Sequence, residues 1–160
     1  MVIATVFLTI IGMTSGYVLG ERHRRQVNAA RTSGQPTTLP PVQGDGVLCP
    51  EVTRLTAQRL GFSSALRQVM KIATVNGTTV WICQDDAGGY YYQGKTGGPD
   101  TALVEGDNGL FLSKVRHSED REEYVAVADN GNRFVVNRRQ LEIHFADGRE
   151  TQISRVVASE

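Results

Sequence analysis

The chain has few of the residues on which catalytic and metal-binding sites depend. Of its 160 residues only two are cysteine and three are histidine, and they form no Cys/His cluster. No pair of them lies at the spacing of a zinc site or a catalytic triad. No serine lies in a nucleophile-elbow pattern, and the glycine pairs at 88–89 and 97–98 do not match a phosphate-binding loop. The sequence therefore predicts no catalytic residues, no metal and no cofactor; an enzyme whose residues meet only in the fold is the least favoured alternative.

An excess of either charge is also missing. The 17 Lys and Arg residues match the 17 Asp and Glu residues, so the formal net charge at pH 7 is zero. Nucleic-acid-binding domains usually carry a basic surface. We therefore expect no nucleic-acid partner.

A long apolar run opens the chain. Residues 2–20 contain no charged residue, and as a helix they would extend roughly 28 Å, close to the roughly 30 Å hydrocarbon thickness of a bilayer. Residues 1–20 are therefore interpreted as a transmembrane anchor. Residues 21–46 begin with a basic flank and continue as a flexible linker containing Pro36, Pro40 and Pro41. The folded domain is expected over residues 47–160.

The orientation of this anchor is ambiguous. The positive-inside rule counts Arg22, Arg24 and Arg25 toward the cytoplasm, which would place the domain inside. The linker and the cysteines favour the extracytoplasmic side, and a basic leader upstream of Met1 would reconcile the two. A cleaved signal peptide is disfavoured because the basic residues follow the apolar run, and a lipoprotein is excluded because Cys49 lies too far from it.

The two cysteines are expected to form a disulfide. Cys49 and Cys83 do not have metal-site spacing, and an oxidising compartment would join them. In a cytoplasmic domain they would instead be two buried free thiols.

One short helix is expected at the start of the domain. Residues 50–60 place apolar side chains near helical spacing, Pro50 suits a first helical turn and Gly61 suits the stop.

Strands and tight turns follow the predicted helix. The Asn-Gly pairs at 76–77 and 130–131 lie between apolar runs and predict two-residue hairpin loops. The expected cross-strand pairs are Ile72 with Trp81, Met70 with Cys83, Val127 with Phe134, and Val125 with Val136. At Asp147-Gly148 a three-residue loop, with Gly148 left-handed, is expected to pair Leu141 with Ile153, since register follows the buried pattern.

With the strands expected at 90–93 and 110–115, the fold class is mainly β. We expect an antiparallel meander or small curled barrel of about eight strands, with the one short N-terminal helix.

Three consecutive tyrosines form the candidate binding surface. In a strand Tyr91 should point away from Tyr90 and Tyr92. One face would fill the core, and the other would expose aromatic surface for a sugar or a protein partner. The alternative is that the tyrosines serve only sheet propensity.

The remaining polar clusters are interpreted as ordinary surface and turn residues. His117 opens a charged loop and His144 should face solvent. Asp85-Asp86 and Asp107-Asn108-Gly109 lack the alternating ligand spacing of a calcium loop and fit turns better.

One motif carries a family resemblance. Trp81-Ile82-Cys83-Gln84-Asp85-Asp86, followed by Gly89 and by Tyr91-Tyr92-Gln93-Gly94, resembles actinobacterial single-pass membrane-anchored extracytoplasmic proteins, some of which carry kinase-associated labels. The resemblance runs from about Cys49 to the C terminus and implies an exported domain with the cysteine pair. Kinase activity does not follow, since the chain has no Gly-rich ATP loop, no His-Arg-Asp loop and no Asp-Phe-Gly motif.

These observations favour a non-catalytic domain held at the outer face of the cell membrane. It would bind an envelope protein or a cell-wall glycan. The alternative is a structural or accessory subunit of a membrane protein complex.

Overall fold

The computed structural model describes residues 46–160. The predicted anchor and all but the last residue of the predicted linker lie outside the described residues. Within 46–160, no helix is both long enough and apolar enough to cross a bilayer.

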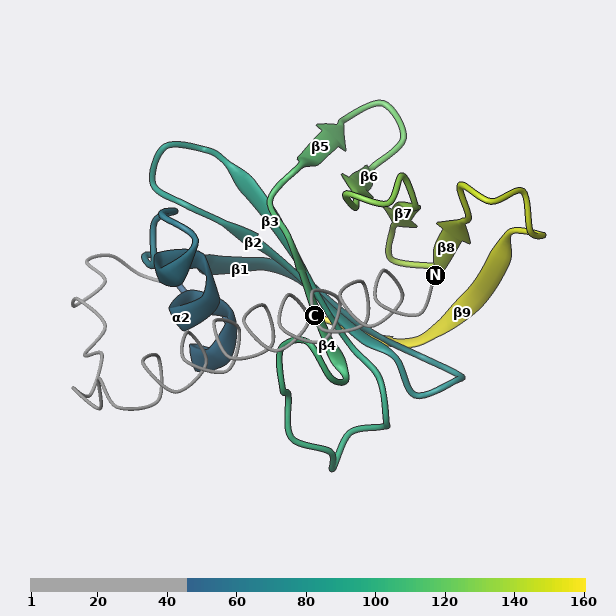
Figure 1. The fold of residues 1–160 in the computed structure, drawn as a ribbon, viewed down its shortest axis with the longest axis horizontal. Helices are drawn as coiled ribbons and strands as arrows, with labels where there is room; N and C mark the ends of the chain where they lie inside the picture. The colour runs from purple at the N-terminus through teal and green to yellow at the C-terminus, as the bar shows by residue number, and fades with distance from the viewer. Residues whose placement is uncertain (1–45) are drawn as a thin grey trace, which may run out of the picture. The chain divides into compact units, whose positions relative to one another are not determined.

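The described residues form one helix and a nine-stranded sheet (Figure 1). The strand order in the sheet is β4-β3-β2-β1-β9-β8-β7-β6-β5, and every neighbouring pair is antiparallel. The elements are α2 (Glu51–Arg59), β1 (Arg67–Thr74), β2 (Thr79–Gln84), β3 (Tyr90–Lys95), β4 (Gly109–Leu112), β5 (Val115–Ser118), β6 (Glu123–Val127), β7 (Arg133–Val136), β8 (Gln140–His144) and β9 (Gln152–Ser159).

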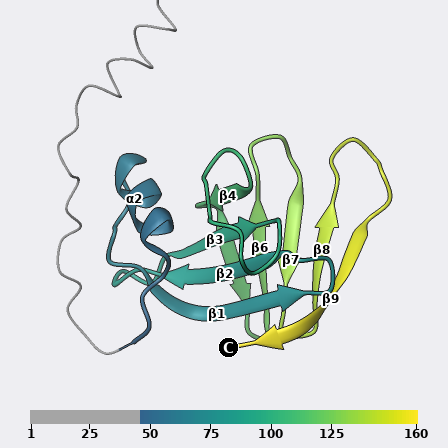
Figure 2. The same cartoon turned by 90° about the horizontal axis from the view of Figure 1, so that it is seen from below.

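Strand β9 joins two meanders into a single sheet. Its first half pairs with β8, and its last half pairs with β1. Figure 2 shows β1–β3 running across the direction of β6–β9, with β9 bending from one direction into the other. The sheet curls into a nearly closed barrel, in which the Tyr90 ring of β3 lies 5.7 Å from the His117 ring of β5 and 5.3 Å from the Tyr124 ring of β6. The mainly β class and the curled-barrel alternative are confirmed.

The barrel interior is an apolar core. Its side chains alternate along the strands with residues that face outward, as the pleat requires. The buried members are Met70, Ile72, Val80, Ile82, Tyr92, Leu112, Ala126, Phe134, Val136 and Leu141.

A second buried cluster lies beneath the helix, on the outer face of β2 and β3. It contains Cys49, Ala57, Leu66, Cys83, Tyr91 and Phe111. The predicted helix is confirmed, with Pro50 at its N-cap and Gly61 (φ 82°) directly after its C-cap. Its buried face consists of Thr53, Thr56 and Ala57.

The two Asn-Gly hairpins have three-residue loops, so the predicted registers are wrong by one residue. At the first, the Thr74 N–H donates to Thr78 O (2.9 Å) and the Gly77 N–H to Thr74 O (3.0 Å). A two-residue type I′ turn needs φ > 0 at both central residues, but only Gly77 has it. The turn is therefore a type I turn followed by a left-handed glycine.

The shift exchanges the two faces of β2. Ile72 pairs with Val80 rather than Trp81, and Met70 with Ile82 rather than Cys83. Trp81 and Cys83 thus belong to the outer face. The 130–131 hairpin has the same loop, which pairs Ala126 with Phe134 and Tyr124 with Val136.

At the third hairpin the left-handed Gly148 (φ 82°) is confirmed, but the register is wrong. Leu141 pairs with Ser154, and Ile153 remains 61% exposed. The buried Ser154 hydroxyl accepts a hydrogen bond from Asn76 Nδ2 (2.9 Å), which satisfies a polar group at a core position. Matching apolar residues across the strands therefore gave the wrong partner.

Cys49 and Cys83 form the expected disulfide, with Cα atoms 6.2 Å apart and 34 residues apart in sequence. Both are buried. The chain next to Cys49 is also hydrogen-bonded to the start of β1, through Cys49 N–H to Leu66 O and Gln68 N–H to Val47 O. The bridge therefore joins the start of α2 to the middle of the sheet.

Replacing both cysteines by alanine should lower the free energy of unfolding by about 3–4 kcal/mol, because the bridge closes a long loop in the unfolded chain. Urea unfolding followed by circular dichroism measures this change. Reduced wild-type protein serves as the control and should match the variant. A double variant as stable as the oxidised wild type would contradict the prediction.

Candidate functional site

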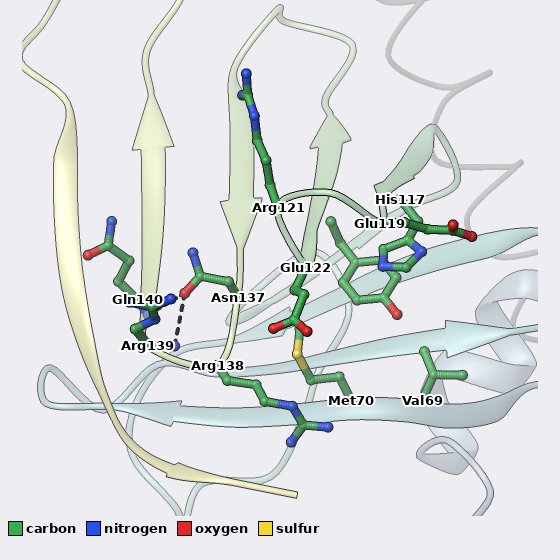
Figure 3. Close-up of a pocket in the computed structure, with 11 residues that line it drawn as sticks. Val69, Met70, His117, Glu119, Arg121, Glu122, Asn137, Arg138, Arg139 and Gln140 are labelled. Atoms are coloured by element: carbon green, nitrogen blue, oxygen red, sulfur yellow. Dashed lines mark hydrogen bonds between the residues drawn. The ribbon is translucent and has the colours of Figure 1, made fainter.

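A pocket of about 520 Å³ lies at the end of the barrel where β5 passes into β6 and β7 into β8 (Figure 3). We call it the barrel-end pocket. Its walls are the β5–β6 loop, the β7–β8 turn, and Val69 and Met70 of β1. Val69 and Met70 are far in sequence from the two loops, and the β1–β9 pairing brings them together.

One wall of the pocket is aromatic. His117 and Tyr124 face each other across the β5–β6 ladder, and their rings stack at 4.4 Å with an interplanar angle of 17°. Tyr90 packs edge-on against Tyr124 behind them. Burial raises the pKa of the Tyr124 phenol, the neighbouring Tyr90 adds to the rise, and the Arg138 guanidinium opposes it. Tyr124 is thus a neutral hydroxyl at neutral pH with a cation nearby.

Arginines from two loops line the pocket. Arg121 pairs with Glu123 at 3.5 Å and points away from the other arginines in Figure 3. Arg138 and Arg139 occupy the β7–β8 turn. Asn137 Oδ1 stabilises this turn by accepting hydrogen bonds from the backbone N–H groups of Arg139 (2.9 Å) and Gln140 (3.0 Å). Within residues 46–160 neither guanidinium of this turn makes an ion pair. Both are available to an anion.

The acidic side of the pocket comes from the β5–β6 loop. Glu119 and Glu122 both line it, and the Glu122 N–H donates to Glu119 O (3.2 Å). Among the described residues, Glu122 is the one non-glycine residue with a positive φ, at 50°. Such a conformation costs free energy and often occurs at binding sites. The loop therefore holds its carboxylate at the pocket at a backbone cost.

The three tyrosines of the candidate binding surface take different positions. Tyr92 is 2% exposed in the barrel core, while Tyr91 lies on the outer face and is 7% exposed. The predicted alternation of the tyrosine side chains is confirmed, but the prediction that one aromatic face is exposed is wrong. Helix α2 and the rings of Phe62 and Phe111 pack around that face. Only Tyr90 borders the pocket's aromatic wall.

The polar residues singled out in the sequence lie in turns or form side-chain pairs at the surface. Asp85 accepts hydrogen bonds from the N–H groups of Ala87 (3.0 Å) and Gly89 (2.7 Å), so the turn interpretation is confirmed. Asn108 likewise organises its own loop. His144 is only partly exposed, with its ring nitrogens on Glu142 (3.0 Å) and Thr151 (3.2 Å).

No metal-binding group appears in the described part of the chain, where no three His, Cys, Asp or Glu side chains converge. The sequence reasoning did not single out Arg138 and Arg139. The signal that could have located them is an Asn followed by two arginines between two apolar strands, which places both cations on an exposed turn.

No family model, curated protein or solved structure matches this chain.

Tyr91 should make stability depend on alkaline pH. Burial raises its pKa to about 12, and the hydrogen bond of its hydroxyl to Asp85 (2.8 Å) and the charge of that carboxylate add to the rise. The folded pKa exceeds the unfolded value of about 10. The stabilisation is therefore complete below pH 10 and lost as pH rises through about 12.

Urea unfolding between pH 9 and pH 12 should thus show a steeper loss of stability for the wild type than for Tyr91→Phe, which keeps the ring but not the ionisable hydroxyl. Tyrosinate absorbance would follow the titration. Parallel curves for the two proteins would exclude the proposed contribution of Tyr91.

Proposed function

We propose that this chain is a non-catalytic, membrane-anchored extracytoplasmic domain that binds an acidic glycan of the cell envelope in its barrel-end pocket. The observation that carries the proposal is that the Arg138 and Arg139 side chains, which make no ion pair within residues 46–160, line the same pocket as the stacked rings of His117 and Tyr124. A volume of about 520 Å³ lies within the range of small-molecule sites.

The chemistry of the lining matches such a ligand. Aromatic rings present an apolar face on which a sugar ring can stack. Guanidinium groups bind carboxylates or phosphates in a bidentate manner. Glu119, Asn137 and Gln140 add acceptors and donors suited to sugar hydroxyls. Arg138 and Arg139 would be used only by an acidic sugar, while Glu122, which also lines the pocket, would accept hydrogen bonds from sugar hydroxyls.

The proposed anchoring of the domain on the extracytoplasmic side of the membrane rests on separate observations. The Cys49–Cys83 disulfide supports an oxidising compartment, and the apolar run over residues 2–20 supports an anchor. The non-catalytic role rests on the sequence, which offers no nucleophile or metal motif.

A second candidate is an accessory subunit of a membrane protein complex. Ile153 and Val157 of β9 are 61% and 64% exposed, and Val75 is exposed where its N–H donates to Arg155 O (3.0 Å). Exposed apolar side chains on one strand favour a protein contact. An Ile153→Asp/Val157→Asp variant would separate the two functions, because it should lose a protein partner and retain glycan binding.

The test of the glycan site is a calorimetric titration of the full-length chain in detergent. A uronic-acid trisaccharide and its carboxyl-reduced, neutral counterpart are the probes. The acid should bind saturably and more weakly as salt rises. Arg138→Gln/Arg139→Gln should weaken binding about tenfold or more, because charged hydrogen bonds are lost.

The matched control is Arg149→Gln, since Arg149 lies outside the pocket and pairs with Asp147 (2.8 Å). This variant should bind like the wild type. Equal binding of the acidic and neutral trisaccharides, or an equal loss in the control, would rule out the proposed arginine site.

A further inference from the structure

A second pocket, of about 310 Å³, lies on the outer face of the barrel and shares no residue with the barrel-end pocket. We call it the outer pocket. The register places Trp81 opposite Lys71 on one side, and Thr79 opposite Lys95 on the other. Pro99 of the β3–β4 loop and the end of β9 complete its walls.

Lys95 is the unusual member of this pocket. It is only 6% exposed, and its Nζ donates to Thr101 O (2.8 Å) and Pro99 O (3.1 Å). An ammonium group has three donors, so one remains. No carboxylate of residues 46–160 lies within ion-pair distance of it. A buried charge without a counter-charge is costly, and an anion in the pocket would offset that cost.

The loop over Lys95 is held in place by other contacts. Gly98 N–H donates to Gly77 O (2.9 Å), and Asn108 bridges the loop by accepting from Val104 N–H (2.8 Å) and donating to Ala102 O (2.9 Å). Since these bonds already organise the loop, the buried ammonium is not its sole support.

The other two charged side chains of the outer pocket pair with each other. Lys71 Nζ pairs with both carboxylate oxygens of Glu160, at 2.9 and 3.0 Å. Trp81 is half-buried and its indole N–H has no hydrogen-bond partner within the described range. Ala73 and Pro99 add apolar surface. The site thus combines one uncompensated cation with an aromatic ring and apolar walls.

We propose that the outer pocket binds a carboxylate carried on a small apolar group, with the carboxylate at Lys95 Nζ and the apolar part against the indole of Trp81. A free small acid and the C terminus of a peptide share this chemistry. The proposal is independent of the glycan site, because the two pockets have no residue in common.

Trp81 is the only tryptophan of the chain, so the fluorescence of the full-length protein in detergent reports directly on the outer pocket. The probes are 4-methylpentanoate and N-acetyl-alanyl-alanine, each compared with its neutral amide. We expect the Trp81 fluorescence to change saturably with one of the acids and to stay unchanged with the amide of that acid. The acid that acts identifies the source as a small acid or a peptide terminus.

Lys95→Met should weaken the effective acid about tenfold or more. Lys114→Met is the matched control, because Lys114 is exposed and pairs with Asp129 (2.9 Å) away from the pocket. Circular dichroism shows whether Lys95→Met folds. If it does not fold, the comparison of acid with amide on the wild-type chain tests the proposed carboxylate site. Equal responses to acid and amide, no saturable response, or an unchanged Lys95→Met would overturn the proposal.

Discussion

The pairing of β1 with β9 is the contact on which the architecture depends. Without it, β1–β4 and β5–β9 would be two separate antiparallel sheets with open edges, each prone to pair with other chains. The backbone groups of Lys71 and Glu160 exchange hydrogen bonds of 3.0 and 2.9 Å, and these close the sheet at its centre. These partners are 89 residues apart, so closing the chain between them costs conformational entropy.

Both candidate sites depend on this pairing. The barrel-end pocket takes one wall from β1 and the others from loops between β5 and β8, which lie beyond β9 in the sheet. The outer pocket takes its floor from β1–β3 and one wall from the end of β9. A chain whose sheet opened at β1 and β9 would therefore lose both pockets while keeping its local hairpins.

Local sequence signals predicted the elements but not their register. The Gly61 stop, the alternation of Tyr91 and Tyr92, and the left-handed Gly148 follow from backbone sterics and the strand period. The Asn-Gly turns did not decide between a two-residue and a three-residue loop, because a left-handed glycine serves both. In β9, the residue opposite Leu141 is Ser154, whose buried hydroxyl is hydrogen-bonded to Asn76, whereas the apolar pattern predicted Ile153 at that position.

The pockets were harder to predict for a geometric reason. The turn at 137–139 and the loop at 119–122 are short polar segments, and each alone is typical of a solvated turn. They become a site only when the curled sheet brings them beside β1. Lys95 likewise gives no signal in sequence, since its burial depends on the loop that folds back over it.

The position of the disulfide has a mechanical consequence. Cys49 is covalently bonded to Cys83, which lies in β2 with β1 and β3 on either side. A pulling force on the chain ahead of Cys49 would pass through the sulfur atoms directly into the centre of the sheet. Residues 50–82, including α2 and β1, would be shielded from that tension. The barrel would then resist traction by shearing β2 against its neighbours rather than by unwinding from its first residue.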